Sequence, residues 1–206
     1  MQTITKMDEY RAAMEQEIRN RRIQNMYHFT DIRNLPSILT RGLLPRTKLN
    51  DGHMNYQAND SQRLDGCQDA VCTTISHTNG KMLYRLLRNT LNHYAVIELI
   101  PEQVLTRDCG FCPTNAACSY MNGRNRKGID CFRAMFSGPN ACFPRDEQAE
   151  ILVFEAIPVS AIRAIHFQWD KDRRAFSKYA PEGVSCDCEK SYLFSTRGYV
   201  YSGVCF

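Results

Sequence analysis

The segment 26–43 constrains the fold of this chain most, because it predicts a strand that runs directly into a short helix. Its first four residues are mainly apolar, which is typical of a strand end. Asn34 is a plausible N-cap, and Pro36 follows in the first turn, where proline is tolerated. Gly42 is placed to close the helix in the left-handed conformation. We expect one apolar helical face, formed by Leu35, Ile38 and Leu39.

Two polar residues, His28 and Thr30, lie at this junction. A strand and a packed helix hold such side chains in fixed positions, which suits a binding site. The alternative is an ordinary connection in which His28 is a hydrogen-bonded histidine of the core.

The composition fits one globular domain. The chain has 206 residues, of which 43% are hydrophobic, and a net charge of +4. This charge is too small to indicate nucleic-acid binding by itself, but it permits a local basic patch. No apolar run of about 18 residues is present, so no transmembrane helix is expected. The charged segment 1–25 has no apolar signal core, and we therefore expect a cytoplasmic protein without a membrane partner.

Ten cysteines are an unusual feature of the sequence. Without an export signal, we expect most of them to be reduced thiols. Cys109 and Cys112, with Cys118 and Cys131, offer four thiolates, but their spacing lacks the second Cys-x-x-Cys pair of a regular zinc site. No metal is therefore expected.

Hydrophobic periodicity predicts a mixture of helices and strands, and hence one α+β domain. Helices are expected at 5–25 and 80–91, and strands at 70–75, 94–100, 151–157 and 161–167. Loops are expected at 45–68, with one helical turn, and at 106–147 and 170–190, with a terminal hairpin at 192–204.

Three segments in order resemble the DarT family of ADP-ribosyltransferase toxins. The first contains Tyr27, His28 and Thr30, followed by Asn34-Leu35 and Gly42-Leu43. The second, at 114–117, is similar to an Asp-x-Asn-Ala-Ala element without its Asp, and the third, at 148–153, is similar to an Ala-Glu-x-Leu-Val strand. The resemblance implies a single ADP-ribosyltransferase domain over 1–206, with mixed antiparallel sheets and flanking helices. Its expected parts are an N-terminal helix (1–25), a family-like core (27–167) and a C-terminal extension (168–206).

The resemblance also implies NAD+ as a substrate. Cleavage of the bond between ribose and nicotinamide passes through an oxocarbenium-like state, which a carboxylate stabilises. Glu150, at the start of an apolar strand, is the expected catalytic glutamate, and Glu147 and Glu155 are its competitors. Arg63 falls near the place of the family's active-site arginine, with Arg46 as its rival.

Further residues are assigned to NAD+ by the same resemblance. His28 is expected to donate to the ribose or nicotinamide side, with Thr30 supporting it. Asn34 serves the dinucleotide or caps its helix. Tyr84 stacks on nicotinamide or packs in the core. The segment 73–77 departs from the family's pattern, which leaves the acceptor pocket open and His77 without an assigned role.

The segment 120–149 leads into Glu150 and combines basic with aromatic residues. Arginines can follow a phosphate backbone while aromatic rings stack on unpaired bases, so this loop is expected to hold single-stranded nucleic acid. The candidate arginines are Arg124, Arg126, Arg133 and Arg145, interleaved with Tyr120, Phe132, Phe136 and Phe143. A charged, solvated loop is the alternative.

We therefore expect a mono-ADP-ribosyltransferase toxin that modifies a base in single-stranded DNA, with RNA as the second candidate acceptor. The resemblance further implies a cognate antitoxin, in a toxin–antitoxin or phage-defence system. A protein-modifying enzyme and a non-catalytic module that binds nucleic acid or a partner are the alternatives.

Overall fold

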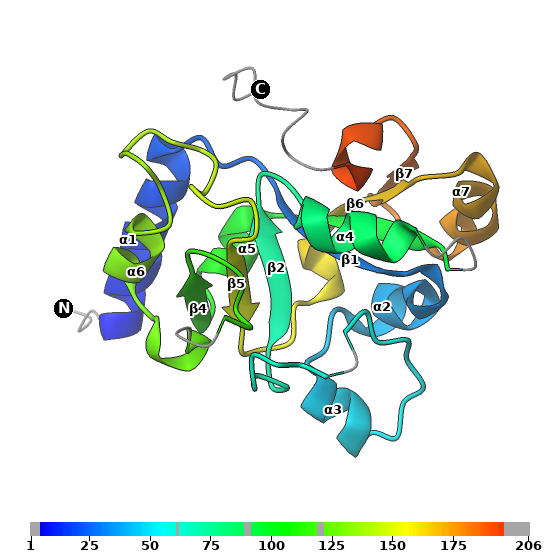
Figure 1. The fold of residues 1–206 in the computed structure, drawn as a ribbon, viewed down its shortest axis with the longest axis horizontal. Coiled ribbons are helices and arrows are strands. Elements are labelled where there is room, and N and C mark those ends of the chain that lie inside the picture. Colours follow the sequence, from blue (N-terminus) through cyan, green and yellow to red (C-terminus); the bar gives the residue numbers. More distant parts are fainter. Residues whose placement is uncertain (1–4, 61, 89–91, 119–121, 196–206) are drawn as a thin grey trace.

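The structure is a computed structural model that describes residues 5–60, 62–88, 92–118 and 122–195 (Figure 1). In these ranges seven strands form one sheet in the order β4-β5-β2-β1-β3-β6-β7. The strands are β1 (Met26–Asp31), β2 (Val71–Ile75), β3 (Tyr94–Leu99), β4 (Cys109–Cys112), β5 (Glu150–Val153), β6 (Ile162–Phe167) and β7 (Ser185–Asp187). Neighbouring strands are antiparallel except for the parallel pair β6 and β7. The α+β prediction is therefore confirmed.

Short helices surround this sheet (Figure 1). They are α1 (Lys6–Asn20), α2 (Leu35–Arg41), α3 (Arg46–Asp51), α4 (Gly80–Leu87), α5 (Pro101–Leu105), α6 (Ile129–Arg133) and α7 (Asp170–Phe176). Figure 1 shows α1 and α6 beside β4 at one end of the sheet, and α2 and α7 toward the other end. None of the helices in the described ranges combines the length and apolar character needed to cross a membrane.

The apolar face of α1 and the buried strands form the main core. Met14 and Ile18 of α1 are buried, and so are Leu35 and Leu39 of α2. Every residue of β3 is buried, as expected for a central strand covered on both faces. The strand β1, which pairs with β3 along its whole length, is thus anchored to this core.

The two central strands β1 and β2 pair over a short distance only. Met26 pairs with Ile75 and Tyr27 with Thr74, whereas β1 pairs with β3 along its whole length. Beyond Tyr27 the strands β1 and β2 separate. This separation opens the sheet at His28.

The junction after β1 is partly as predicted. Gly42 ends α2 with φ +82°, and a Cβ atom there would lie 2.2 Å from the carbonyl oxygen of Ile157. Only glycine fits such a position without strain. The predicted cap at Asn34 is wrong, because its side chain makes no capping hydrogen bond. Asp31 instead accepts a hydrogen bond from the Arg33 amide in the preceding 3-10 turn.

Two segments that were predicted to be loops contain regular secondary structure. The segment 170–190 contains α7 and β7 rather than a continuous loop, and the segment 106–147 contains β4 and α6. A short charged helix such as α7 has little periodic signal, and a contact distant in sequence, from His93 Nδ1 to Asp172 Oδ2 at 2.7 Å, holds it. In place of the predicted hairpin, Ser191–Phe194 form a 3-10 turn, and residues 196–206 lie outside the described residues.

The cysteines do not gather into a metal site in the described ranges. No group of three or more His, Cys, Asp or Glu side chains there is arranged to hold a metal ion. Among the described residues, eight cysteines are free thiols: Cys67, Cys72, Cys109, Cys112, Cys118, Cys131, Cys186 and Cys188.

Candidate functional site

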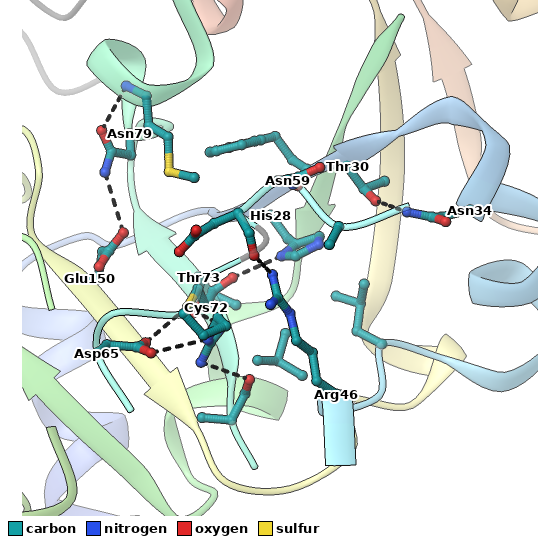
Figure 2. A pocket seen from close by; sticks show the side chains of 18 of the residues that line it. His28, Thr30, Asn34, Arg46, Asn59, Asp65, Cys72, Thr73, Asn79 and Glu150 are labelled. Carbon is teal, nitrogen blue, oxygen red and sulfur yellow. Dashed lines mark hydrogen bonds and ion pairs between the residues drawn. The ribbon is translucent and has the colours of Figure 1, made fainter. Parts of the chain in front are cut away.

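A cavity of about 560 Å³ lies where β1 and β2 separate (Figure 2). Its volume falls within the range of small-molecule and cofactor sites. The walls come from β1, β2, α2, α4 and the segment 55–65, and the start of β5 contributes Glu150. His28, Thr30, Asn34, Arg63 and Glu150, predicted from sequence as site residues, all line this one cavity.

His28 bridges the gap between the two separated strands. Its Nδ1 atom lies 2.8 Å from the carbonyl oxygen of Cys72 on β2. Because a carbonyl oxygen only accepts, Nδ1 is the donor and carries the proton. Burial lowers the pKa of His28, so the ring is neutral at neutral pH. Nε2 is then an acceptor, and the expectation that the free nitrogen of His28 donates to a ligand is corrected.

A polar network fastens the segment 55–60 over β1. Asn34 Nδ2 donates to Thr30 Oγ1 at 2.9 Å and to the Gln57 carbonyl oxygen at 2.8 Å, and Asn34 Oδ1 accepts from the Gln57 amide at 2.8 Å. Asn59 Nδ2 donates to the Phe29 carbonyl oxygen at 2.6 Å. Asn34 therefore shapes the cavity wall instead of capping a helix. The roles of Gln57 and Asn59 were not found from the sequence, because they depend on a loop that returns to β1.

Glu150 is the first residue of β5 and is only 8% exposed. Its Oε2 accepts a hydrogen bond from the Ala116 amide at 2.8 Å. Its Oε1 accepts one from Asn79 Nδ2 at 3.3 Å, which Figure 2 shows. Burial raises the pKa of Glu150, because it disfavours the charged carboxylate. The segment 114–117 thus touches the carboxylate through its backbone.

The competing carboxylates are engaged elsewhere. Glu147 forms an ion pair with Lys81 at 2.7 Å, and Glu155 forms one with Arg107 at 3.1 Å. Neither side chain lines the cavity. Among the three glutamates, only Glu150 faces the cavity.

Two arginines, Arg46 and Arg63, also line the cavity. Arg63 contacts Asp65 at 3.1 Å, Cys72 Sγ at 3.0 Å and the Ala70 carbonyl oxygen at 3.3 Å, and its backbone has φ +45°. A non-glycine residue in this region is strained and is kept there by its surroundings. Arg46 donates to the Asp60 carbonyl oxygen. Burial and the positive charge of Arg63 lower the pKa of Arg46, and two neighbouring cations of this kind suit an anionic ligand.

The structure does not bring Tyr84 or His77 to the cavity. Tyr84 is 54% exposed on the outer side of α4, so it neither packs in the core nor lines the cavity; Met82 and Leu86 line it from this helix. His77 is buried outside the cavity, with Nδ1 2.9 Å from the Thr78 carbonyl oxygen. Asn79, which contacts Glu150, was missed, although an Asn before an apolar helical face is a recognisable N-cap.

The predicted nucleic-acid arginines of segment 120–149 mostly have protein partners. Arg124 pairs with Asp69 at 2.6 Å, Arg126 Nε donates to the Phe111 carbonyl oxygen at 2.9 Å, and Arg133 pairs with Glu17 at 2.7 Å. Arg145 is exposed. The base-stacking role of two aromatics is wrong, because Phe132 and Phe136 are buried in the core; Tyr120 lies outside the described residues.

Comparisons with known proteins match most of the chain. The family model described as "ssDNA thymidine ADP-ribosyltransferase, DarT" matches residues 27–185. No curated protein sequence matches.

Solved structures share the fold. Thermosipho africanus DarTG in complex with ADP-ribose has a TM-score of 0.62 at 19% identity, over 83% of this chain and 51% of that chain. This chain therefore spans about half of the Thermosipho chain. Thermus sp. 2.9 DarT in complex with NAD+ has a TM-score of 0.56 at 16% identity, over 83% of this chain and 97% of that chain. The same Thermus protein in complex with ADP-ribosylated ssDNA has a TM-score of 0.61 at 14% identity, over 84% of this chain and 97% of that chain.

Proposed function

This chain belongs to the DarT family of ssDNA thymidine ADP-ribosyltransferases, and from that premise we propose that its cavity binds NAD+ and transfers ADP-ribose to a thymidine of single-stranded DNA. The family model covers the cavity's elements from β1 to β5. The Thermus relative has been solved with NAD+ and with ADP-ribosylated ssDNA. The observation that carries the proposal is the buried carboxylate of Glu150, which faces the same cavity as His28 and Thr30.

The cavity offers a group for each part of NAD+. Arg46 and Arg63 suit the diphosphate, which carries the negative charge of the dinucleotide. The neutral His28 accepts a hydrogen bond from a ribose hydroxyl through Nε2, while Thr30 and Asn34 fix the adjoining wall. Glu150 lines the same cavity, where it stabilises positive charge at ribose C1′.

The reaction exchanges one bond to C1′ for another. The bond from C1′ to the nicotinamide nitrogen breaks, and nicotinamide leaves with the electron pair. A lone pair of the thymine base then forms the new bond to C1′, and the base loses a proton. A desolvated carboxylate is a stronger base than one in water, so the raised pKa of Glu150 also suits it to accept this proton.

The test uses labelled NAD+ and four acceptors: a thymidine-containing DNA strand, the same strand without thymidine, the matching RNA, and protein. We expect label on the first strand alone. Glu150→Gln keeps the side-chain volume but removes the charge, and should reduce transfer by about 10²–10³-fold.

The matched control is Glu147→Gln, which changes an ion-paired carboxylate outside the cavity and should retain near-normal transfer. Label on protein or RNA alone would refute the assigned acceptor. Equal losses in the two variants would refute the assigned role of Glu150.

The remaining assignments concern the cellular setting. We infer a cognate antitoxin for this chain, because the Thermosipho relative is a DarTG protein. We also propose that the whole chain, 1–206, acts as one ADP-ribosyltransferase domain in the cytoplasm, where NAD+ and DNA are both present.

A further inference from the structure

The helix α4 has an exposed basic face that the reaction does not use. Lys81, Tyr84, Arg85 and Arg88 are exposed at spacings of three and four residues, which places them on one side of the helix. The opposite side is apolar and includes the fully buried Leu83. We call these four exposed residues the α4 face.

The α4 face begins at the cavity. Lys81 and Arg85 line it, whereas Tyr84 and Arg88 do not. Figure 1 shows α4 crossing the sheet beside β2 and β1, the strands that separate to form the cavity. The face therefore leads from the cavity to the outer surface of the molecule.

The charges of the α4 face are largely unneutralised. Lys81 pairs with Glu147 at 2.7 Å, but the side chains of Arg85 and Arg88 form no ion pair or hydrogen bond with another described residue. In segment 120–149, Arg124 and Arg133 have carboxylate partners, and Arg126 donates to the Phe111 carbonyl oxygen. Arg85 and Arg88 therefore offer two cations to an anionic partner, and Arg85 lies at the cavity itself.

We propose that the α4 face binds the acceptor strand and leads its phosphate backbone to the cavity, with Tyr84 stacking on a base. This inference rests on the proposed function and assigns the strand to α4 rather than to segment 120–149. Arginines neutralise phosphates, and an exposed aromatic ring stacks on any unpaired base, so together they suit single-stranded DNA. The 54% exposure of Tyr84, unexplained by packing, fits this role.

The test measures binding of a fluorescent, thymidine-containing single strand by anisotropy, without NAD+, from about 50 to about 200 mM salt. The informative variant is Tyr84→Ala/Arg88→Gln, because neither residue lines the cavity. We expect an affinity loss of about 10–100-fold, from one lost stack and one lost phosphate contact. The slope of log affinity against log salt should fall by about 0.7, the value for one phosphate in a single strand.

A matched control is Lys178→Gln/Tyr179→Ala. This pair also removes one cation and one exposed tyrosine, and neither residue lines the cavity. The two side chains are neighbours, with Lys178 Nζ 5.1 Å from the Tyr179 ring centroid. It should bind DNA as the unaltered protein does. NAD+ affinity, measured by calorimetry, should be unchanged in both double variants.

Three results would overturn the inference. The first is wild-type DNA affinity in Tyr84→Ala/Arg88→Gln, particularly if Arg124→Gln/Arg126→Gln loses it. The second is an equal loss of NAD+ affinity in the α4 variant, which would indicate a distorted cavity. The third is absence of DNA binding by the unaltered protein, which would refute the proposed function as well.

Discussion

Asn79 allows a direct test of how the protein tunes its buried carboxylate. Its side chain has two partners: Oδ1 accepts from the Met82 amide at 3.2 Å and caps α4, and Nδ2 donates to Glu150 at 3.3 Å. The substitution Asn79→Asp separates these functions. Aspartate caps a helix as well as asparagine does, but it cannot donate to Glu150 when ionised.

The magnitude follows from the geometry. In Asn79→Asp a carboxylate oxygen replaces the amide nitrogen beside Glu150. At an effective dielectric constant of about 20, two negative charges about 4 Å apart repel by about 4 kcal/mol, which corresponds to about three pH units. Asn79→Ser also keeps a capping oxygen but adds no charge, and losing one hydrogen bond to a charged group costs about 1.5 kcal/mol, or about one pH unit.

The assay is the pH dependence of kcat/KM for NAD+, measured with saturating single-stranded DNA. Transfer needs ionised Glu150, so activity falls as the pH drops through the raised pKa of this group. We expect this acidic limb to move to higher pH in Asn79→Ser and further in Asn79→Asp. The melting temperature of Asn79→Ser should stay near that of the unaltered protein, because the cap is kept. That of Asn79→Asp should fall at neutral pH, because the added repulsion acts on the folded state.

An acidic limb that stays in place in both variants would refute the assignment of this limb to Glu150. An acidic limb that moves equally in the two variants would show that a charge at residue 79 does not raise the pKa of Glu150. A large loss of melting temperature in Asn79→Ser would mean that the cap geometry is not preserved.

Three further predictions concern single residues. His28→Ala should raise KM for NAD+ more than it lowers kcat. The lowered pKa of His28 predicts that the NAD+ affinity of the unaltered protein stays constant from about pH 8 to about pH 6.5, and a loss of affinity centred near pH 6.5 that is absent in His28→Ala would contradict this prediction. Gly42→Ala should lower the free energy of unfolding, measured by denaturant titration, by about 2 kcal/mol or more. The control Gly128→Ala, at a glycine with φ +86° and open space around it, should lower it less, and equal losses would refute the role of the Ile157 contact. Because the pKa of Glu150 is raised on folding, the contribution of Glu150 to stability decreases as pH rises above about 4.3. Glu150→Gln should therefore gain stability relative to the unaltered protein as pH rises from about 5 to about 8, and a relative loss would contradict the sign.

The sequence determined the elements whose signals are local. The segment 26–43 predicted a strand, a helix and a glycine with positive φ, and the structure has β1, α2 and Gly42 at φ +82° in these places. The apolar run after Glu150 likewise predicted a strand that starts at the glutamate, as β5 does. These features depend on neighbouring residues, so periodicity and turn chemistry are sufficient to find them.

Only the tertiary structure decided the partners of the polar side chains. Asn79 and Glu150 are 71 residues apart, and Arg133 and Glu17 are 116 apart, yet both pairs are in contact. The side of α4 that packs on the sheet determines whether Tyr84 faces the cavity or the solvent. Leu83 is on the buried side, and Tyr84 therefore faces the solvent. Asn34 bonds to Gln57 instead of capping its helix because the segment 55–60 returns to β1. Such contacts depend on how distant segments pack, which no local pattern encodes.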